Sequence, residues 1–303
     1  MMRTFLRHPR SGLLNLRALC LILLALDLPT GAGAGAERAK LERPVMMDSN
    51  GPGSELLVLD ASGILHELRV TQNSLEENRK ITLPRELIAA DMAYSLSDGQ
   101  ESLLIAGTKS GRGIVVRYSL DGRSLKTWSF RNVCSGIDFG VASHSAYVAT
   151  SDSNEIYRLD LQGTEITYVT RIANAAKLGP LAFDEARREI YVADVASGRI
   201  YQYSIATKAS KVLVADLSAP TALVFDPETR RLFIADPGRR AIFTVDTRSS
   251  KVVATEFASD PLKAPYGLTL ISKGRVAVAD YGTHSVLIFS SKGGLLFRFP
   301  SPN

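Results

Sequence analysis

Short apolar segments recur along this chain, each embedded in a longer alternation of strand-like runs and turn residues. Six of them are SELLVLD (54–60), ESLLIAG (101–107), HSAYVAT (144–150), EIYVAD (189–194), RLFIAD (231–236) and RVAVAD (275–280). Their last residues are 47, 43, 44, 42 and 44 residues apart. A period in the low forties, filled with short β-branched and aromatic segments, is typical of the blades of a β-propeller.

Each repeat divides into four strand-like segments. The fifth repeat shows this most clearly, with TALVFD (221–226), RLFIAD, AIFTVD (241–246) and KVVATEF (251–257) separated by turn residues. The sequence therefore predicts an all-β, six-bladed β-propeller of four-stranded antiparallel blades. A β-solenoid of six repeats is the weaker alternative, because that fold uses shorter repeats.

The two ends of the repeat region predict how the ring closes. The first repeat already begins with an innermost strand at 43–48, and the last already ends with an outermost strand at 295–300. No terminal strand needs to cross to the other end, so we expect blade six to pack directly on blade one. The second strands are almost entirely apolar, as expected for sheets covered on both faces.

The first 36 residues have the pattern of a signal peptide. Four arginines precede the apolar run ALCLILLAL (18–26), and small residues follow in TGAGAGA (30–36). The apolar run is shorter than the roughly 20 residues that cross a membrane. We expect cleavage near Ala34 or Ala36 and a secreted or periplasmic protein without a membrane span. An arginine-rich organellar presequence is the alternative.

Removal of this leader changes the charge of the chain. The whole sequence has 36 basic and 31 acidic residues, and the leader contains four arginines and one aspartate. The remaining 37–303, interpreted as one propeller domain, has 32 basic and 30 acidic residues, a net charge near +2. No cluster of Lys or Arg marks a surface for nucleic acid, and we expect a monomer that binds none.

Cysteine and histidine offer little chemistry. Cys134 is the one cysteine after the leader, which excludes an internal disulfide, and its place just before the strand-like segment SGIDFG (135–140) predicts a buried small residue. His66, His144 and His284 fall in a third strand and in two different turns, so they are not expected to share one zinc ion. The aspartates that end several second strands, such as Asp236, are expected to accept hydrogen bonds from turn amides.

Two segments carry a resemblance to known propellers. APTALVFDPETRRLFIADPGRRAIFTVD (219–246) and APYGLTLISKGRVAVADYGTHSVLIF (264–289) resemble the NHL repeat and the six-bladed propellers of the gluconolactonase/senescence-marker type. The resemblance implies a functional site at the mouth of the central channel, where the innermost strands begin. It does not specify an activity, because the same repeats occur in lactonases, lyases and pure binding proteins.

Alignment of the repeats predicts which side chains surround this mouth. Glu42 aligns with Ala89 and Cys134 in a first ring. A second ring contains four candidate binding residues, which are Arg43, Ser135, Thr221 and Tyr266.

The resemblance also implies one divalent cation at the mouth, held by a first-blade glutamate and by Asn or Asp residues of later blades. Glu42, Asp91 and Asp138 are the candidate ligands for a hard cation such as calcium. Blades four to six have Gly179-Pro180, Thr221-Ala222 and Tyr266-Gly267 where further ligands would stand. We therefore expect no required cofactor.

Three functions remain open at this point. The first is a secreted binding or assembly platform for a protein, peptide or glycan, which the degraded channel pattern favours. The second is a metal-dependent, lactonase-like hydrolase whose site lies at the channel mouth. The third is a carrier of a small molecule, or a non-hydrolytic enzyme that uses the channel.

Overall fold

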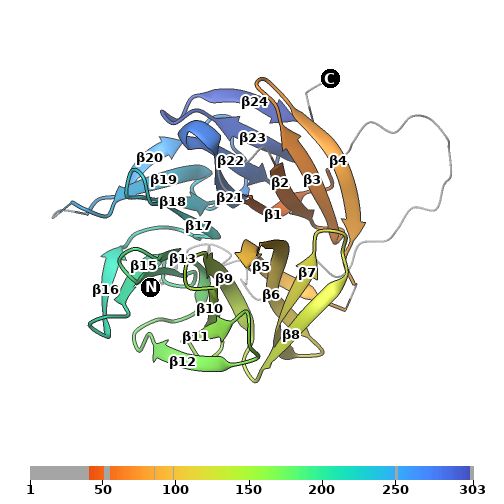
Figure 1. Ribbon diagram of the computed structural model, residues 1–303. Coiled ribbons are helices and arrows are strands. Elements are labelled where there is room, and N and C mark those ends of the chain that lie inside the picture. Colours follow the sequence, from red (N-terminus) through yellow and green to blue (C-terminus); the bar gives the residue numbers. More distant parts are fainter. Residues whose placement is uncertain (1–40, 51–54, 85, 98, 250–251, 301–303) are drawn as a thin grey trace, which may run out of the picture. The chain divides into compact units, whose positions relative to one another are not determined.

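The structure contains six four-stranded antiparallel sheets arranged in a ring (Figure 1). It is a computed structural model that describes residues 41–50, 55–84, 86–97, 99–249 and 252–300. In every sheet the four strands are neighbours in chain order. The prediction of a six-bladed propeller is confirmed. The expected signal peptide and its cleavage sites lie outside the described residues.

The six blades share one strand order. The innermost strands are β1 (Pro44–Ser49), β5 (Ile88–Ser97), β9 (Cys134–Gly140), β13 (Leu178–Asp184), β17 (Ala222–Asp226) and β21 (Pro265–Ile271). The second strands are β2 (Glu55–Asp60), β6 (Gln100–Lys109), β10 (Ser145–Thr150), β14 (Glu189–Asp194), β18 (Arg231–Asp236) and β22 (Arg275–Asp280). The third strands are β3 (Ile64–Val70), β7 (Arg112–Ser119), β11 (Glu155–Asp160), β15 (Arg199–Ser204), β19 (Ala241–Asp246) and β23 (Ser285–Phe289). The outermost strands are β4 (Leu75–Thr82), β8 (Ser124–Phe130), β12 (Ile166–Arg171), β16 (Ala209–Val214), β20 (Thr255–Ala258) and β24 (Leu295–Phe299). A 3₁₀ turn, η3 (Ser272–Gly274), precedes β22.

The core of the protein lies between the blades. The described residues form six apolar clusters, and each cluster joins the facing sheets of two neighbouring blades. Successive residues of a second strand point to opposite faces, so Ile190 packs toward blade three and Tyr191 toward blade five. This explains why the second strands are apolar at nearly every position.

Blade six closes the ring against blade one, as the sequence predicted. One apolar cluster contains Met47 and Val58 of blade one together with Val286 and Ile288 of blade six. Polar bonds add to this seam, because Ser49 Oγ donates to Leu270 O at 2.7 Å. The outermost strands β4 and β24 belong to the first and last blades.

Aspartates at the ends of second strands fix the loops that lead into the innermost strands. Asp236 is fully buried, and its carboxylate accepts the backbone N–H groups of Ser218 at 2.7 Å and Ala219 at 3.0 Å. Asp194 and Asp280 bind the corresponding amides in blades four and six. The expected structural role of these aspartates is confirmed.

Asp236→Ala is expected to lower the free energy of unfolding by about 2 kcal/mol, because it removes the buried acceptor of two backbone amides. Chemical denaturation of both proteins at neutral pH measures this loss. Thr255→Ala, an exposed site in the same blade, is the control and should change stability by less than about 0.5 kcal/mol. Equal stability of Asp236→Ala and wild type would contradict the proposed role of the carboxylate.

One predicted alignment is wrong by two residues. Pro44, rather than Glu42, pairs with Asp60 and thus stands level with Ala89 and Cys134, which pair with Gly107 and Thr150. Glu42 precedes Asp60 by as many residues as Ala89 precedes Gly107, which predicts first and second hairpins of equal length. Among the described residues only blade two extends its first two strands so far, and Glu42 lies before β1 and is exposed.

Candidate binding site at the channel mouth

The innermost strands share an irregularity near the channel mouth. In five blades their pairing with the second strand shifts within the first residues, for example between Ala89 and Asp91 and between Pro265 and Gly267. Such β-bulges bend a strand and redirect a side chain. Ser135 and Tyr266 are the extra residues of their blades, which agrees with their predicted position at the mouth.

Four side chains from three blades gather on one side of this mouth. Arg43 Nη1 donates to the hydroxyl of Tyr281 at 3.1 Å, and the Arg43 guanidinium lies 5.4 Å from the centre of the same ring. The rings of Tyr281 and Tyr266 are 5.4 Å apart and tilted by 51°. Thr221 Oγ1 donates to the Tyr266 carbonyl at 3.0 Å. We call Arg43, Thr221, Tyr266 and Tyr281 the mouth cluster.

The structure brings together three of the four predicted mouth residues. Arg43, Thr221 and Tyr266 belong to the mouth cluster, and all are partly exposed. Ser135 stands in blade three, where its hydroxyl donates to Ala149 O of the same blade at 3.2 Å. Tyr281 was missed from the sequence. Its signal was its position directly after RVAVAD, which repeats the second-strand pattern of the other blades, at the same end of the blade as the channel mouth.

The three candidate metal ligands lie at different places in the fold. Glu42 is exposed before β1, whereas Asp91 and Asp138 are on the innermost strands of blades two and three. Among the described residues, no group of three or more His, Cys, Asp or Glu side chains is placed to hold a metal ion. The carboxylates of Asp91 and Asp138 have other partners.

Three aspartates link neighbouring innermost strands inside the channel. Asp48 Oδ2 accepts the N–H of Tyr94 at 2.6 Å, Asp91 Oδ2 that of Ile137 at 3.0 Å, and Asp138 Oδ2 that of Phe183 at 2.7 Å. In each case the acceptor lies one blade before the donor. An innermost strand is the edge of its sheet, so these amides have no strand partner. The carboxylates therefore fasten blades one to four at the channel.

Burial changes the acidity of these channel aspartates. Desolvation raises the pKa of Asp48 to about 6, that of Asp138 to about 7 and that of Asp91 to about 8. The hydrogen bonds from backbone amides oppose this rise, while repulsion among the three carboxylates adds to it. Asp91 thus carries a proton for much of its time at neutral pH.

Asp48 was missed because of the alignment error in blade one. It pairs with Leu57 three positions from Asp60, and Asp138 pairs with Tyr147 three positions from Thr150. Counted from Pro44, the sequence would have placed Asp48 level with Asp138. Two carboxylates facing the channel at one level, on blades one and three, would then have been visible from the sequence.

The remaining titratable groups are built into the blades. His66 is buried in β3 between Asp60, at 3.0 Å, and Glu77, at 2.6 Å. These hydrogen bonds, opposed by desolvation, raise the pKa of His66. Cys134 is buried as expected, and desolvation raises the pKa of its thiol to about 12. A thiol of this kind is not a nucleophile at neutral pH.

Comparisons with known proteins define the class of the protein. No family model matches the chain, and no curated protein matches it. One similar solved structure is titled "Crystal structure of Nidogen/Laminin Complex", with a TM-score of 0.67 and 17% sequence identity over 82% of this chain and 94% of that chain. At this identity the likeness shows the fold alone, which is a six-bladed β-propeller. The finer resemblance to NHL and gluconolactonase-type propellers stays a prediction.

No helix within the described part of the chain is long and apolar enough to cross a membrane.

Proposed function

We propose that this propeller is a secreted binding platform that holds a protein or peptide at its channel mouth. The mouth cluster carries the proposal. Tyrosine and arginine are among the side chains that contribute most to protein interfaces, because both offer large contact areas together with hydrogen-bond donors. A rigid ring that presents such residues from three blades provides a preorganised surface.

The use of the channel carboxylates also favours binding over hydrolysis. Asp91 and Asp138 each accept a backbone amide from the next blade, so they already serve the packing of the propeller. A hard cation requires six or more oxygen ligands, and the innermost strands of blades four to six supply few. The nidogen/laminin complex concerns a protein that binds another protein, which agrees with a platform role for this fold. Glycans remain a second class of ligand to be tested.

Selection of peptides on the purified protein tests the proposal. A random peptide library is enriched on wild type after removal of peptides that bind Arg43→Ala/Tyr281→Ala. The enriched peptides should bind wild type in the micromolar range, and the double variant should bind them about 30-fold more weakly, a loss of about 2 kcal/mol. Glycan arrays with the same two proteins test the second class of ligand.

Ser135→Ala is the matched control, since Ser135 lies at the mouth but outside the mouth cluster; it should retain the affinity of wild type within about twofold. If no peptide or glycan is found whose binding depends on Arg43 and Tyr281, the proposal is contradicted. The hydrolase alternative would be supported by an equimolar divalent metal that survives dialysis and by lactone hydrolysis lost in Asp138→Ala.

A further inference from the structure

A cleft of about 360 Å³ opens between blades three and four at the end of the blades opposite the channel mouth. Its lining residues include two arginines, one acid and two aromatic residues, which are Arg158, Arg188, Glu185, Tyr147 and Phe183. Arg158 and Arg188 are exposed, while Tyr147 and Phe183 are buried beneath them. The cleft therefore has an aromatic floor and a charged rim.

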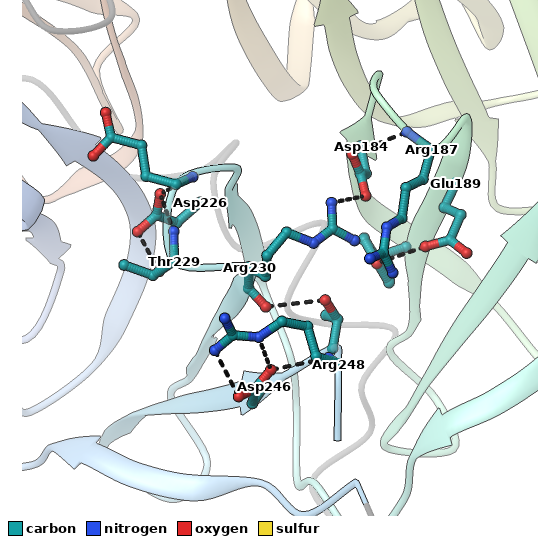
Figure 2. Close-up of polar contacts among 11 residues, drawn as sticks. Asp184, Arg187, Glu189, Asp226, Thr229, Arg230, Asp246 and Arg248 are labelled. Atoms are coloured by element: carbon teal, nitrogen blue, oxygen red, sulfur yellow. Dashed lines mark hydrogen bonds and ion pairs between the residues drawn. The ribbon is translucent and has the colours of Figure 1, made fainter. Parts of the chain in front are cut away.

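The next interface along the ring shows what an arginine at this position binds. Arg230 of blade five occupies the repeat position of Arg188, four residues after the end of the innermost strand, and both have a left-handed backbone with φ of 61° and 56°. Arg230 Nη1 donates to Asp184 Oδ2 of the preceding blade at 2.6 Å (Figure 2). Its guanidinium lies 5.0 Å from the centre of the Phe225 ring.

The interface between blades three and four repeats this construction without the carboxylate. Tyr147 and Phe183 have ring centres 4.4 Å apart, and the corresponding pair Tyr191 and Phe225 has them 5.4 Å apart. At the position of Asp184, however, blade three has Gly140: Gly140 pairs with Ser145, as Asp184 pairs with Glu189. Blade three thus offers Arg188 no acid at this place.

Two more replacements change the charge in the same direction. Ser145 stands where blade four has Glu189, and Arg158 stands where it has Gln202, because Arg158 pairs with Tyr147 as Gln202 pairs with Tyr191. Compared with the interface between blades four and five, this cleft lacks acids at the positions of Asp184 and Glu189 and has an additional base, Arg158. Its own acid, Glu185, is held in place by the backbone N–H groups of Ala142 at 3.0 Å and Ser143 at 2.7 Å. Two guanidiniums and one carboxylate leave the cleft with a positive charge.

We propose that this cleft binds a carboxylate from outside the chain, beside Arg188 and Arg158. Arg188 and Arg158 supply the positive charge, and guanidinium groups match a carboxylate with two parallel hydrogen bonds. The Tyr147 hydroxyl supplies a further donor. The source of the carboxylate is either an acidic side chain of a peptide or a small organic acid. The proposal concerns a different face from the mouth cluster and does not rest on its function.

Gly140 makes room for the groups that line the cleft beside it. A Cβ atom at Gly140 would lie 2.6 Å from Ser143 Oγ, 2.7 Å from Glu185 Oε1 and 2.8 Å from Phe183 Cε1. Any larger residue would displace the Ser143 hydroxyl, the Glu185 carboxylate or the Phe183 ring, which occupy the space beside Gly140. The Tyr147 hydroxyl also stays protonated: desolvation raises its pKa, although Arg158 and Arg188 oppose the rise.

Titrations of the ¹⁵N-labelled protein by NMR test the proposal at low ionic strength. The probes are acetyl-Gly-Glu-Gly-amide, the same peptide with Gln in place of Glu, and propionate. The amide signals of Ala142 and Ser143 should shift with the Glu peptide, with a dissociation constant on the order of 1 mM, as expected for an exposed charged site. The Gln peptide should leave both signals in place.

Variants locate the binding group. Arg188→Gln and Arg158→Gln should each weaken binding of the Glu peptide by about tenfold or more. Arg187→Gln removes an exposed arginine next to Arg188 that lies outside the cleft lining, and should change the dissociation constant by less than about twofold.

The two carboxylate probes distinguish the sources. Propionate binding as tightly as the Glu peptide assigns the cleft to small organic acids, and tighter binding of the peptide assigns it to an acidic segment of a partner. Equal shifts with the Gln peptide, or unchanged binding by Arg188→Gln, would overturn the proposal. All variants lie on the surface, and their melting temperatures serve as a check of folding.

Discussion

Replacing Asp184 by Ala should lower the free energy of unfolding by about 3 kcal/mol, because it leaves a largely buried guanidinium without its counter-ion. The side chain of Asp184 is 1% exposed and that of Arg230 is 14% exposed. Arg230 Nε and Nη2 already have no hydrogen-bond partner among the described residues. Asp184 is therefore the acceptor that compensates for burying this charge between blades four and five.

Urea denaturation at pH 7 measures the loss, and Figure 2 contains the matched control. Asp246 and Arg248 form an ion pair at 3.0 Å in the same view, but their side chains are 40% and 55% exposed. Asp246→Ala should therefore cost less than about 0.5 kcal/mol. The double variant Asp184→Ala/Arg230→Met should regain part of the stability lost by Asp184→Ala. Similar effects of Asp184→Ala and Asp246→Ala would contradict the importance of burial.

The fold could be predicted from the sequence because a propeller repeats one local pattern six times. Segments such as RLFIAD and AIFTVD specify strands by composition, and the period near 43 specifies how many strands a blade contains. A mistaken strand assignment in one repeat therefore does not affect the assignment of the other five. The misplaced level of Glu42 shows the limit of this argument, since hairpin length alters the register of a strand without altering the number of blades.

The candidate site could be predicted only in part. The position of Tyr266 and Thr221 follows from the repeat, because every innermost strand begins at the same end of the ring. The contact of Arg43 with Tyr281 does not follow, because it joins residues of the first and last blades that meet only when the ring closes. The cleft beside Gly140 could not be predicted either. It is recognised only by comparison with Asp184, which the next blade has at the corresponding position.

The channel aspartates predict how stability depends on pH. Their folded pKa values, about 6 for Asp48, about 8 for Asp91 and about 7 for Asp138, lie above the value near 4 expected in the unfolded chain. A raised carboxyl pKa means that the folded state binds protons more tightly than the unfolded state. This contribution is complete below about pH 4 and is lost as the pH rises through the folded values.

Other titratable groups do not reverse this direction between pH 5 and pH 8.5. His66 also has a raised pKa, so its contribution is likewise lost as the pH rises. Asp60 and Asp194 have lowered pKa values, and both are ionised in either state above about pH 5. The three channel carboxyls lose their protons in coupled steps, and each keeps part of its surface open to solvent. We expect the free energy of unfolding to fall by about 3 kcal/mol over this range.

Asp91→Asn should remove the largest single share of this pH dependence. The amide oxygen of Asn can still accept the N–H of Ile137, while the side chain no longer becomes charged inside the channel. The variant should therefore be more stable than wild type at pH 8.5, by about 1 to 2 kcal/mol, and no more stable at pH 5. Urea denaturation at the two pH values and constant ionic strength measures the difference, with the exposed Asp246→Asn as control. A wild-type stability that rises from pH 5 to pH 8.5, or an Asp91→Asn variant with an unchanged pH profile, would show that the channel carboxyls remain ionised, and their bonds to Tyr94, Ile137 and Phe183 would then be those of full carboxylates.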